Sequence, residues 1–169
     1  MQAALSGYSD LAMRTVARER GAPYALNEVV LDALVLQKGK LQKRILSVPE
    51  HDHPVGGQLM GSRPETFGEA ARELVRAGYD VVDVNFGCPV NKVLGRHRGG
   101  WLLQEPETAL AMVDAVLQAV AGDAPVTVKM RRGSDDSAEA EARFWRILEG
   151  AIARGIAAVT VHPRTVAQK

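Results

Sequence analysis

Several features that point to particular protein classes are scarce or missing in this 169-residue sequence. It has a single cysteine, Cys88, so no disulfide can form within the chain, which excludes a disulfide-rich secreted scaffold. Aromatic residues make up only 5%, and the formal net charge of +1 lacks the basic excess of a dedicated nucleic-acid-binding module. No signal-peptide pattern occurs, and no apolar run approaches the ~18 residues of a membrane span. The sequence therefore predicts a soluble, cytoplasmic protein.

What the sequence does contain is an alternation of short apolar runs with longer segments of helical period. Hydrophobic residues make up 46% and charged residues 24%, which is enough for a packed core. The clearest unit is a strand over Val55–Met60, followed by a helix that begins at Pro64 and ends at Gly78. The same pattern predicts strands at 81–86, 126–130 and 157–162, helices from Pro106 and from about Ala138, and a weaker strand at 24–27. This alternation is typical of βαβ units and a parallel sheet.

The number of units suggests an incomplete domain. About six strands can be counted, and each but the last is followed by a helix or a helical turn. A doubly wound open sheet and part of an eight-stranded barrel both fit this pattern. A complete barrel usually takes ~250 residues, so this chain would hold about six of its eight β/α units. We therefore expect an α/β fold of the TIM (β/α)8 type, incomplete, with residues 1–169 forming part of the catalytic domain.

Four predicted strands end with a polar residue that apolar packing does not explain: Gln58, Asn85, Lys129 and His162. Strand parity turns these side chains away from the flanking valines. In a barrel the carboxyl ends of the strands converge on the active-site mouth, where a ligand would satisfy such groups. Exposure of strand ends to water is the alternative explanation for any one position. Taken together, an ammonium, an amide and an imidazole favour a shared site for a flavin ring.

The single cysteine lies in a loop directly after the strand at 81–86, within the sequence Asn-Phe-Gly-Cys-Pro-Val-Asn-Lys-Val at 85–93. A lone cysteine usually fills a small apolar gap, but here Gly87, Pro89 and a basic stretch at 92–98 surround it. The segment resembles the N-x-G-C-P-x-x-K-V signature of tRNA-dihydrouridine synthases. Other segments resemble that family in the same order along the chain: 7–10 with Arg14, 27–28, 57–61, 125–131 and 161–165.

The resemblance implies a TIM barrel with FMN across its mouth and a reaction on a uridine in tRNA. Hydride would pass from the reduced flavin to C6 of a flipped-out uridine, Cys88 would protonate C5, and NADPH would reduce the flavin again. The resemblance also implies roles for further residues. Gln58, Lys129, His162 and the backbone of Ala4, Leu5 and Ser6 would contact FMN, and Asn85, Lys92 and Arg131 would lie near the substrate.

The chain departs from the family pattern in three ways. Ala4-Leu5-Ser6 stands where the family usually has Pro-Met-Ala. The loop at 95–100 carries two arginines and a histidine where small residues are common, and it is either a phosphate contact or a solvated loop. The last two barrel strands, which supply most of the FMN phosphate site, and the carboxyl-terminal helical tRNA-binding domain are absent from residues 1–169.

Other interpretations are compatible with the sequence. Another FMN barrel, such as a dihydroorotate or dihydropyrimidine dehydrogenase, would apply the same flavin chemistry to a free pyrimidine. A truncated, non-catalytic remnant would bind neither flavin nor tRNA, and would aggregate or pair through its strand edges. A cysteine nucleophile with His162 as base lacks an orienting third group. A metal site is not expected, because only His51 and His53 among the histidines are close in sequence, in a polar loop.

Overall fold

The computed structural model describes residues 1–169 and contains one parallel sheet. Its strands are β1 (Ala25–Leu26), β2 (Val30–Leu31), β3 (Val55–Met60), β4 (Val81–Phe86), β5 (Val126–Arg131) and β6 (Ala158–His162). β1 and β2 pair with opposite ends of β3, and the order then continues β4, β5, β6. A single bridge from Gln2 to Ala25 extends the sheet at the β1 edge. The strands predicted at 24–27, 55–60, 81–86, 126–130 and 157–162 are therefore all present, whereas β2 and the bridge at Gln2 were not predicted.

Helices follow the strands along the chain. They are α1 (Leu11–Glu19), α2 (Asp32–Leu36), α3 (Lys40–Ile45), α4 (Pro64–Arg76), α5 (Asn91–Leu94), α6 (Pro106–Val120) and α7 (Ala138–Ala153), with 3-10 turns η1 (Glu50–Asp52) and η2 (Gly99–Gln104). The helices expected from Pro64, Pro106 and Ala138 begin at those residues. No helix combines the length and apolar character that crossing a membrane demands.

α4 illustrates how the local sequence sets these boundaries. Pro64 occupies the first turn, where its missing N–H is not needed, and Glu65 lies near the positive end of the helix dipole. Gly78, with φ of 96°, provides the left-handed turn that ends the helix. The buried face of α4 consists of Phe67, Gly68, Ala70, Ala71 and Leu74. Burial of each large apolar side chain contributes about 1.5–3 kcal/mol, so this face holds α4 on the sheet.

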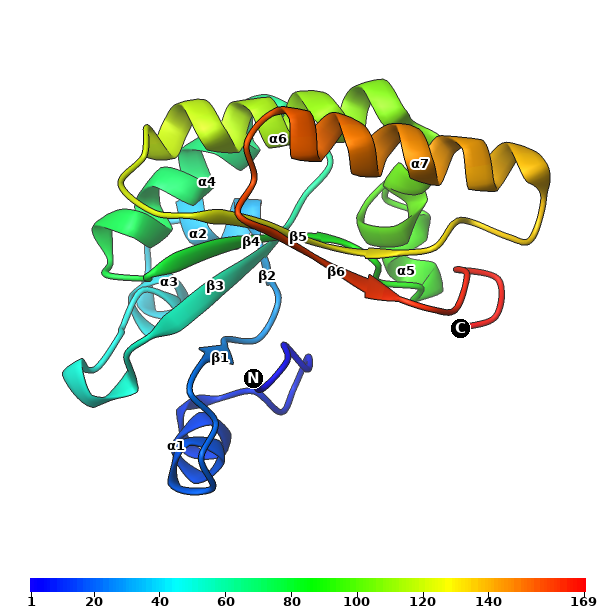
Figure 1. Ribbon diagram of the computed structural model, residues 1–169. Helices are drawn as coiled ribbons and strands as arrows, with labels where there is room; N and C mark the ends of the chain where they lie inside the picture. The colour runs from blue at the N-terminus through cyan, green and yellow to red at the C-terminus, as the bar shows by residue number, and fades with distance from the viewer.

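The sheet has one apolar and one polar face. The apolar face packs under α4, α6 and α7, and its fully buried residues are Val82, Val84, Phe86, Val126, Val128 and Met130. The opposite face carries the polar residues of β3, β4 and β5, which alternate with the apolar ones. In Figure 1 the three long helices form a single layer over one side of the sheet. The expected barrel-type fold is confirmed, since a doubly wound sheet carries helices on both faces.

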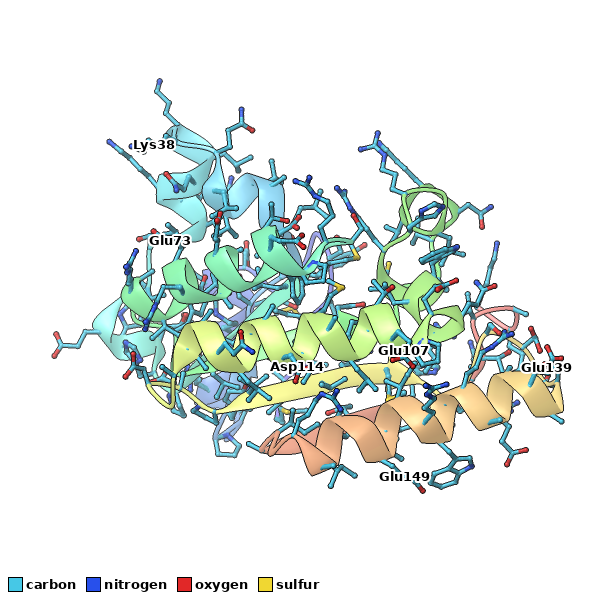
Figure 2. The ribbon with its side chains drawn as sticks, turned by 90° about the horizontal axis from the view of Figure 1, so that it is seen from above. Lys38, Glu73, Glu107, Asp114, Glu139 and Glu149 are labelled. Atoms are coloured by element: carbon cyan, nitrogen blue, oxygen red, sulfur yellow. The ribbon has the colours of Figure 1, made fainter.

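The outer surface of this helical layer is charged. Glu73 on α4, Asp114 on α6 and Glu139 on α7 are labelled in Figure 2, which views the layer from above. Asp114 accepts from Arg154 Nε at 2.7 Å, an exposed ion pair of the kind that contributes little to stability. Because the helices face solvent, the chemistry of the protein has to be sought on the polar face of the sheet and at its loops.

Candidate active site

The polar residues predicted at the strand ends lie on one face and toward one end of the sheet. The register places these pairs side by side: Gln58 with Asp83, Asn85 with Lys129, and Arg131 with His162. Cys88 follows the last residue of β4 by two positions, so it lies at the same end. The sheet therefore brings Gln58, Lys129, His162 and Cys88 together, as the shared-site hypothesis requires.

A chain of hydrogen bonds runs from the middle of this face to the cysteine loop. Gln58 Nε2 donates to Asp83 Oδ2 at 2.6 Å, and Asn85 Nδ2 donates to Gln58 Oε1 at 2.8 Å. Asn85 Oδ1 in turn accepts the backbone N–H groups of Gly87 and Cys88, each at 3.0 Å. Gln58, Asp83 and Asn85 are all buried. The backbone that carries the thiol is thus held by side chains of β3 and β4.

Arg131 holds the same loop from the other side. Its Nε donates to the Gly87 carbonyl at 2.8 Å and its Nη1 donates to the Thr165 carbonyl at 2.9 Å. Arg131 is 7% exposed, and both bonds are buried. The guanidinium thereby joins the cysteine loop to the segment that follows β6. The location of Arg131 near the substrate stays a prediction, but its Nε and Nη1 already donate to backbone carbonyls.

Two glycines pack against Cys88. Gly100 N–H donates to the Cys88 carbonyl at 3.0 Å. Gly99 has φ of +57°, and a Cβ on it would lie 2.9 Å from Cys88 Cβ. A side chain at Gly99 would therefore push the cysteine out of place. Cys88 itself is a free thiol and only partly buried, so it is accessible at the mouth.

Lys129 and Asp83 give the site its electrostatic character. Lys129 is partly buried and forms no hydrogen bond or ion pair, and burial lowers its pKa while the Asp83 carboxylate opposes that shift. Burial also raises the pKa of Asp83, against hydrogen bonds from Thr127 and Gln58. An ammonium without a partner at a barrel mouth favours an anionic or electron-rich ligand. The residues present therefore fit a flavin ring.

His162 is oriented by the backbone that follows it. Its Nδ1 lies 3.1 Å from the backbone nitrogen of Arg164 and accepts that N–H. Burial first, and then the positive charges of Arg131, Lys129 and Arg164, lower the pKa of His162 below its ordinary 6.5. A neutral ring whose Nδ1 accepts must carry its proton on Nε2. That N–H is free to donate to a ligand carbonyl oxygen.

The amino-terminal loop has its own internal support. Ser9 is fully buried, and its Oγ accepts the Leu5 N–H at 2.6 Å and donates to the Ala3 carbonyl at 3.1 Å. Gly7 N–H donates to Glu28 Oε2 at 2.7 Å. These bonds fix the backbone around the residues predicted to line FMN: Ala4, Leu5 and Ser6. Leu5 and Ser6 are exposed, and no hydrogen bond links this loop to Lys129 or His162.

A buried ion pair fixes α1 below that loop. Arg14 Nη2 and Asp52 Oδ2 are 2.5 Å apart, with both side chains at most 5% exposed. Arg14 Nη1 also donates to the Ser9 carbonyl at 2.7 Å and to Asn27 Oδ1 at 2.9 Å. The residues that resemble the family's first loop and second strand are therefore joined through one guanidinium, which gives Arg14 a structural role.

Some features of the site lie beyond what the sequence indicated. Asp83 and Thr127 belong to the polar network, although neither is among the four polar residues predicted to end a strand. Lys92 is exposed on α5 and makes no contact with the network. A cavity of about 580 Å³ lies between α1, β2 and α3 and does not include Cys88. An open half-barrel does not enclose its mouth. No group of three or more His, Cys, Asp or Glu side chains is arranged to hold a metal ion.

Comparisons with known proteins agree with this geometry. The family model for dihydrouridine synthase (Dus) matches residues 1–169. The probable tRNA-dihydrouridine synthase 1 of Synechocystis sp. is 35% identical over 168 residues, 99% of this chain and 46% of that protein. The tRNA-dihydrouridine synthase B of Pseudomonas aeruginosa is 33% identical over 163 residues, 96% of this chain and 48% of that protein.

A solved structure supports the fold independently. Histamine dehydrogenase from Rhizobium sp. 4-9 matches 88% of this chain and 32% of its own chain with a TM-score of 0.61 and 16% identity. At that identity the likeness concerns the fold alone.

Fold and site define an α/β protein of the TIM-barrel type, with polar groups and one thiol at the carboxyl ends of its strands. The full-length match to the family model shows that the chain belongs to the dihydrouridine synthase family. It spans about half the length of the curated relatives it matches.

Proposed function

We propose that this chain is part of a tRNA-dihydrouridine synthase, a flavin-dependent oxidoreductase that reduces the C5–C6 double bond of a uridine in tRNA, with NADPH as reductant, in the cytoplasm. Residues 1–169 would form part of its TIM-barrel catalytic domain. The remaining barrel strands and a helical tRNA-binding domain would lie in sequence outside this range. One observation carries the proposal: the Cys88 thiol lies at the same end of the sheet as Gln58, Lys129 and His162 in a chain that matches the family throughout.

The polar face has the groups that would hold FMN. Lys129, without a partner of its own, would offset negative charge on the ring, and His162 Nε2–H and the second amide hydrogen of Gln58 would donate to ring oxygen or nitrogen atoms. The backbone of residues 4–6 would line one side of the ring. When bound, FMN supplies the hydride that is added to C6 of the uridine.

Cys88 would complete the reduction. Addition of hydride to C6 leaves negative charge on C5 and the conjugated carbonyl oxygen, so a positioned acid has to supply a proton. The thiol gives its proton to C5 and regains one from solvent. Overall, uridine, NADPH and one proton yield dihydrouridine and NADP⁺. Asn85 keeps the thiol in place by accepting the N–H groups of Gly87 and Cys88.

The tRNA would approach over the loop that carries Lys92, Arg96 and Arg98. None of these cations forms an ion pair, and the sequence has no acidic residue between Asp83 and Glu105. The loop is joined to the cysteine loop by the bond from Gly100 N–H to the Cys88 carbonyl. Phosphates that flank a flipped-out uridine would meet these side chains. Asn85 and Arg131, together with Lys92, would lie closest to the uridine itself.

The test uses the purified protein encoded by the gene, as wild type, Cys88→Ala and Cys88→Ser. We expect all three to retain FMN, seen by absorbance, and to oxidise NADPH. Only the wild type should form dihydrouridine at full rate in tRNA, measured by mass spectrometry of digested nucleosides. Glu149→Gln, on the exposed surface of α7, is the matched control and should behave as wild type. Full dihydrouridine formation by Cys88→Ala would remove Cys88 from the mechanism.

A further inference from the structure

Asp83 is a buried carboxylate beneath the cysteine loop that touches neither the loop nor the mouth. It is 3% exposed and lies in register between Gln58 on β3 and Thr127 on β5. Gln58 Nε2 donates to its Oδ2 at 2.6 Å, and Thr127 Oγ1 donates to its Oδ1 at 2.5 Å. Both oxygens therefore accept hydrogen bonds, and neither faces a ligand.

An ionised carboxylate can only accept, and this fixes the direction of every bond that follows. Gln58 has to turn its NH₂ group toward Asp83, which leaves Oε1 facing Asn85. Asn85 then has to turn its own NH₂ group toward Gln58 Oε1, at 2.8 Å, which leaves Oδ1 facing the loop. That oxygen accepts the N–H groups of Gly87 and Cys88. With the Gln58 amide reversed, its Oε1 would face the Asp83 carboxylate and its NH₂ group would face that of Asn85. With the Asn85 amide reversed, its Oδ1 would face Gln58 Oε1 and the loop would lose its acceptor.

We propose that Asp83 is a positioning residue which, through Gln58 and Asn85, sets the amide orientations that hold the backbone of Cys88. Its importance for proton delivery rests on the proposed function, but its effect on the thiol does not. Asp83 forms no hydrogen bond with Cys88, and its side chain is connected to the Cys88 backbone by the directed hydrogen bonds of Gln58 and Asn85. An apolar residue of the same volume would fill the space equally well but would leave the Gln58 amide free to turn.

Burial raises the pKa of Asp83, and the hydrogen bonds from Thr127 and Gln58 and the charge of Lys129 oppose that shift and favour the carboxylate. The charge of Lys129 on β5 acts on Asp83, and the charge of Asp83 acts on Tyr24. The ammonium of Lys129 compensates the negative charge without a direct bond to Asp83. Asp83 thus remains an acceptor for Gln58 while Lys129 keeps its own hydrogens for a ligand.

The experiment measures how fast iodoacetamide alkylates Cys88, the only cysteine in the chain. Asp83→Leu removes the acceptor, so we expect alkylation to accelerate by about fivefold or more, the factor that corresponds to one lost hydrogen bond. Asp83→Asn can accept from Gln58 and donate to Thr127, so it should stay within about twofold of wild type. Thr127→Val is the matched control, because it leaves the bond between Gln58 and Asp83 intact.

A double-mutant cycle separates positioning from general loosening. If Asp83 acts through Gln58, Gln58→Leu should accelerate alkylation as much as Asp83→Leu, and the double variant should add nothing further. The proposal would be overturned if the two accelerations multiply in the double variant. It would also be overturned if Asp83→Leu is alkylated at the wild-type rate. If Asp83→Leu does not fold, the alkylation rates of Gln58→Leu and Thr127→Val decide. Faster alkylation of Cys88 in Gln58→Leu but not in Thr127→Val supports the proposal, and equal alkylation rates in the two variants refute it.

Turnover provides a second readout for the intact enzyme. Asp83→Leu should lower kcat for dihydrouridine formation while KM for tRNA stays unchanged, and Asp83→Asn should restore kcat. A rise in KM with unchanged kcat would contradict a positioning role. Because alkylation needs neither flavin nor tRNA, a negative alkylation result refutes the role of Asp83 alone, whereas absence of dihydrouridine with the wild type refutes the proposed function.

Discussion

Replacing Arg131 should destabilise the protein and loosen two loops together. Its Nε and Nη1 donate to the carbonyls of Gly87 and Thr165, at 2.8 and 2.9 Å, in a buried setting. Hydrogen bonds from a charged donor contribute about 1.5–3 kcal/mol each, so the two bonds supply about 3–6 kcal/mol. Burial lowers the pKa of Arg131, which means that the charged form is desolvated at a cost. Relief of that cost in Arg131→Met leaves a net loss of about 2–4 kcal/mol.

The assay is urea unfolding followed by circular dichroism, with the free energy of unfolding extrapolated to water. Arg131→Lys can satisfy one of the two carbonyls, so it should lose about half as much as Arg131→Met. Arg143→Met is the control, because Arg143 forms only an exposed ion pair with Glu139 at 3.6 Å and should lose less than about 0.5 kcal/mol.

Local opening should accompany the loss of stability. Without the guanidinium, the amides of the cysteine loop and of the segment around Thr165 should exchange hydrogen faster, while those of β4 should not. An Arg131→Met protein as stable as the Arg143→Met control, with unchanged exchange in both loops, would show that Arg131 does not hold the Gly87 and Thr165 carbonyls. That result would also refute the structural argument for the position of Cys88.

Two further predictions concern charge. Because the pKa of His162 lies below 6.5, the folded state binds fewer protons than the unfolded state in the window just below that value, so stability should fall as pH drops through it. An NMR titration of His162 with a midpoint at or above 6.5 would contradict this. The logarithm of the tRNA-binding constant falls linearly with the logarithm of the salt concentration, with a slope of ~0.9 per phosphate contact. Replacing both Arg96 and Arg98 by Ala should therefore reduce the magnitude of this slope by about 1.8. Lys38→Ala with Lys40→Ala, at α3, should leave the slope unchanged, and equal slopes in all variants would exclude the loop as a contact.

The barrel-type fold could be predicted because its signals are local and repeated. Pro64 and Pro106 mark helix starts, and the alternation of valines with Asp83 and Asn85 marks a strand with two different faces. β2 and η2 were not predicted, because their short sequences carry no period. η2 contains Gly99 and Gly100, whose role is close packing against Cys88, and packing of that kind leaves no trace in a single sequence.

The candidate site, like the fold, has features that the sequence could predict and features that it could not. Gln58, Lys129 and His162 could be found because each is a polar residue in the second half of a short strand, and the strands can be recognised in the sequence. The direction of the hydrogen bonds through Asp83, and the hydrogen bonds from Arg131 to Gly87 and Thr165, depend on contacts between segments distant in sequence. Such contacts are decided by register and side-chain rotamers, which only the three-dimensional arrangement specifies.

The most direct test of the proposed function measures dihydrouridine in cellular tRNA after deletion of the gene that encodes this chain. Mass spectrometry of isolated tRNAs should reveal at least one position that changes from dihydrouridine to uridine. The modification should return with the wild-type gene and stay absent with the Cys88→Ala gene. Unchanged dihydrouridine at every position, in cells that carry no second gene of this family, would contradict the assignment.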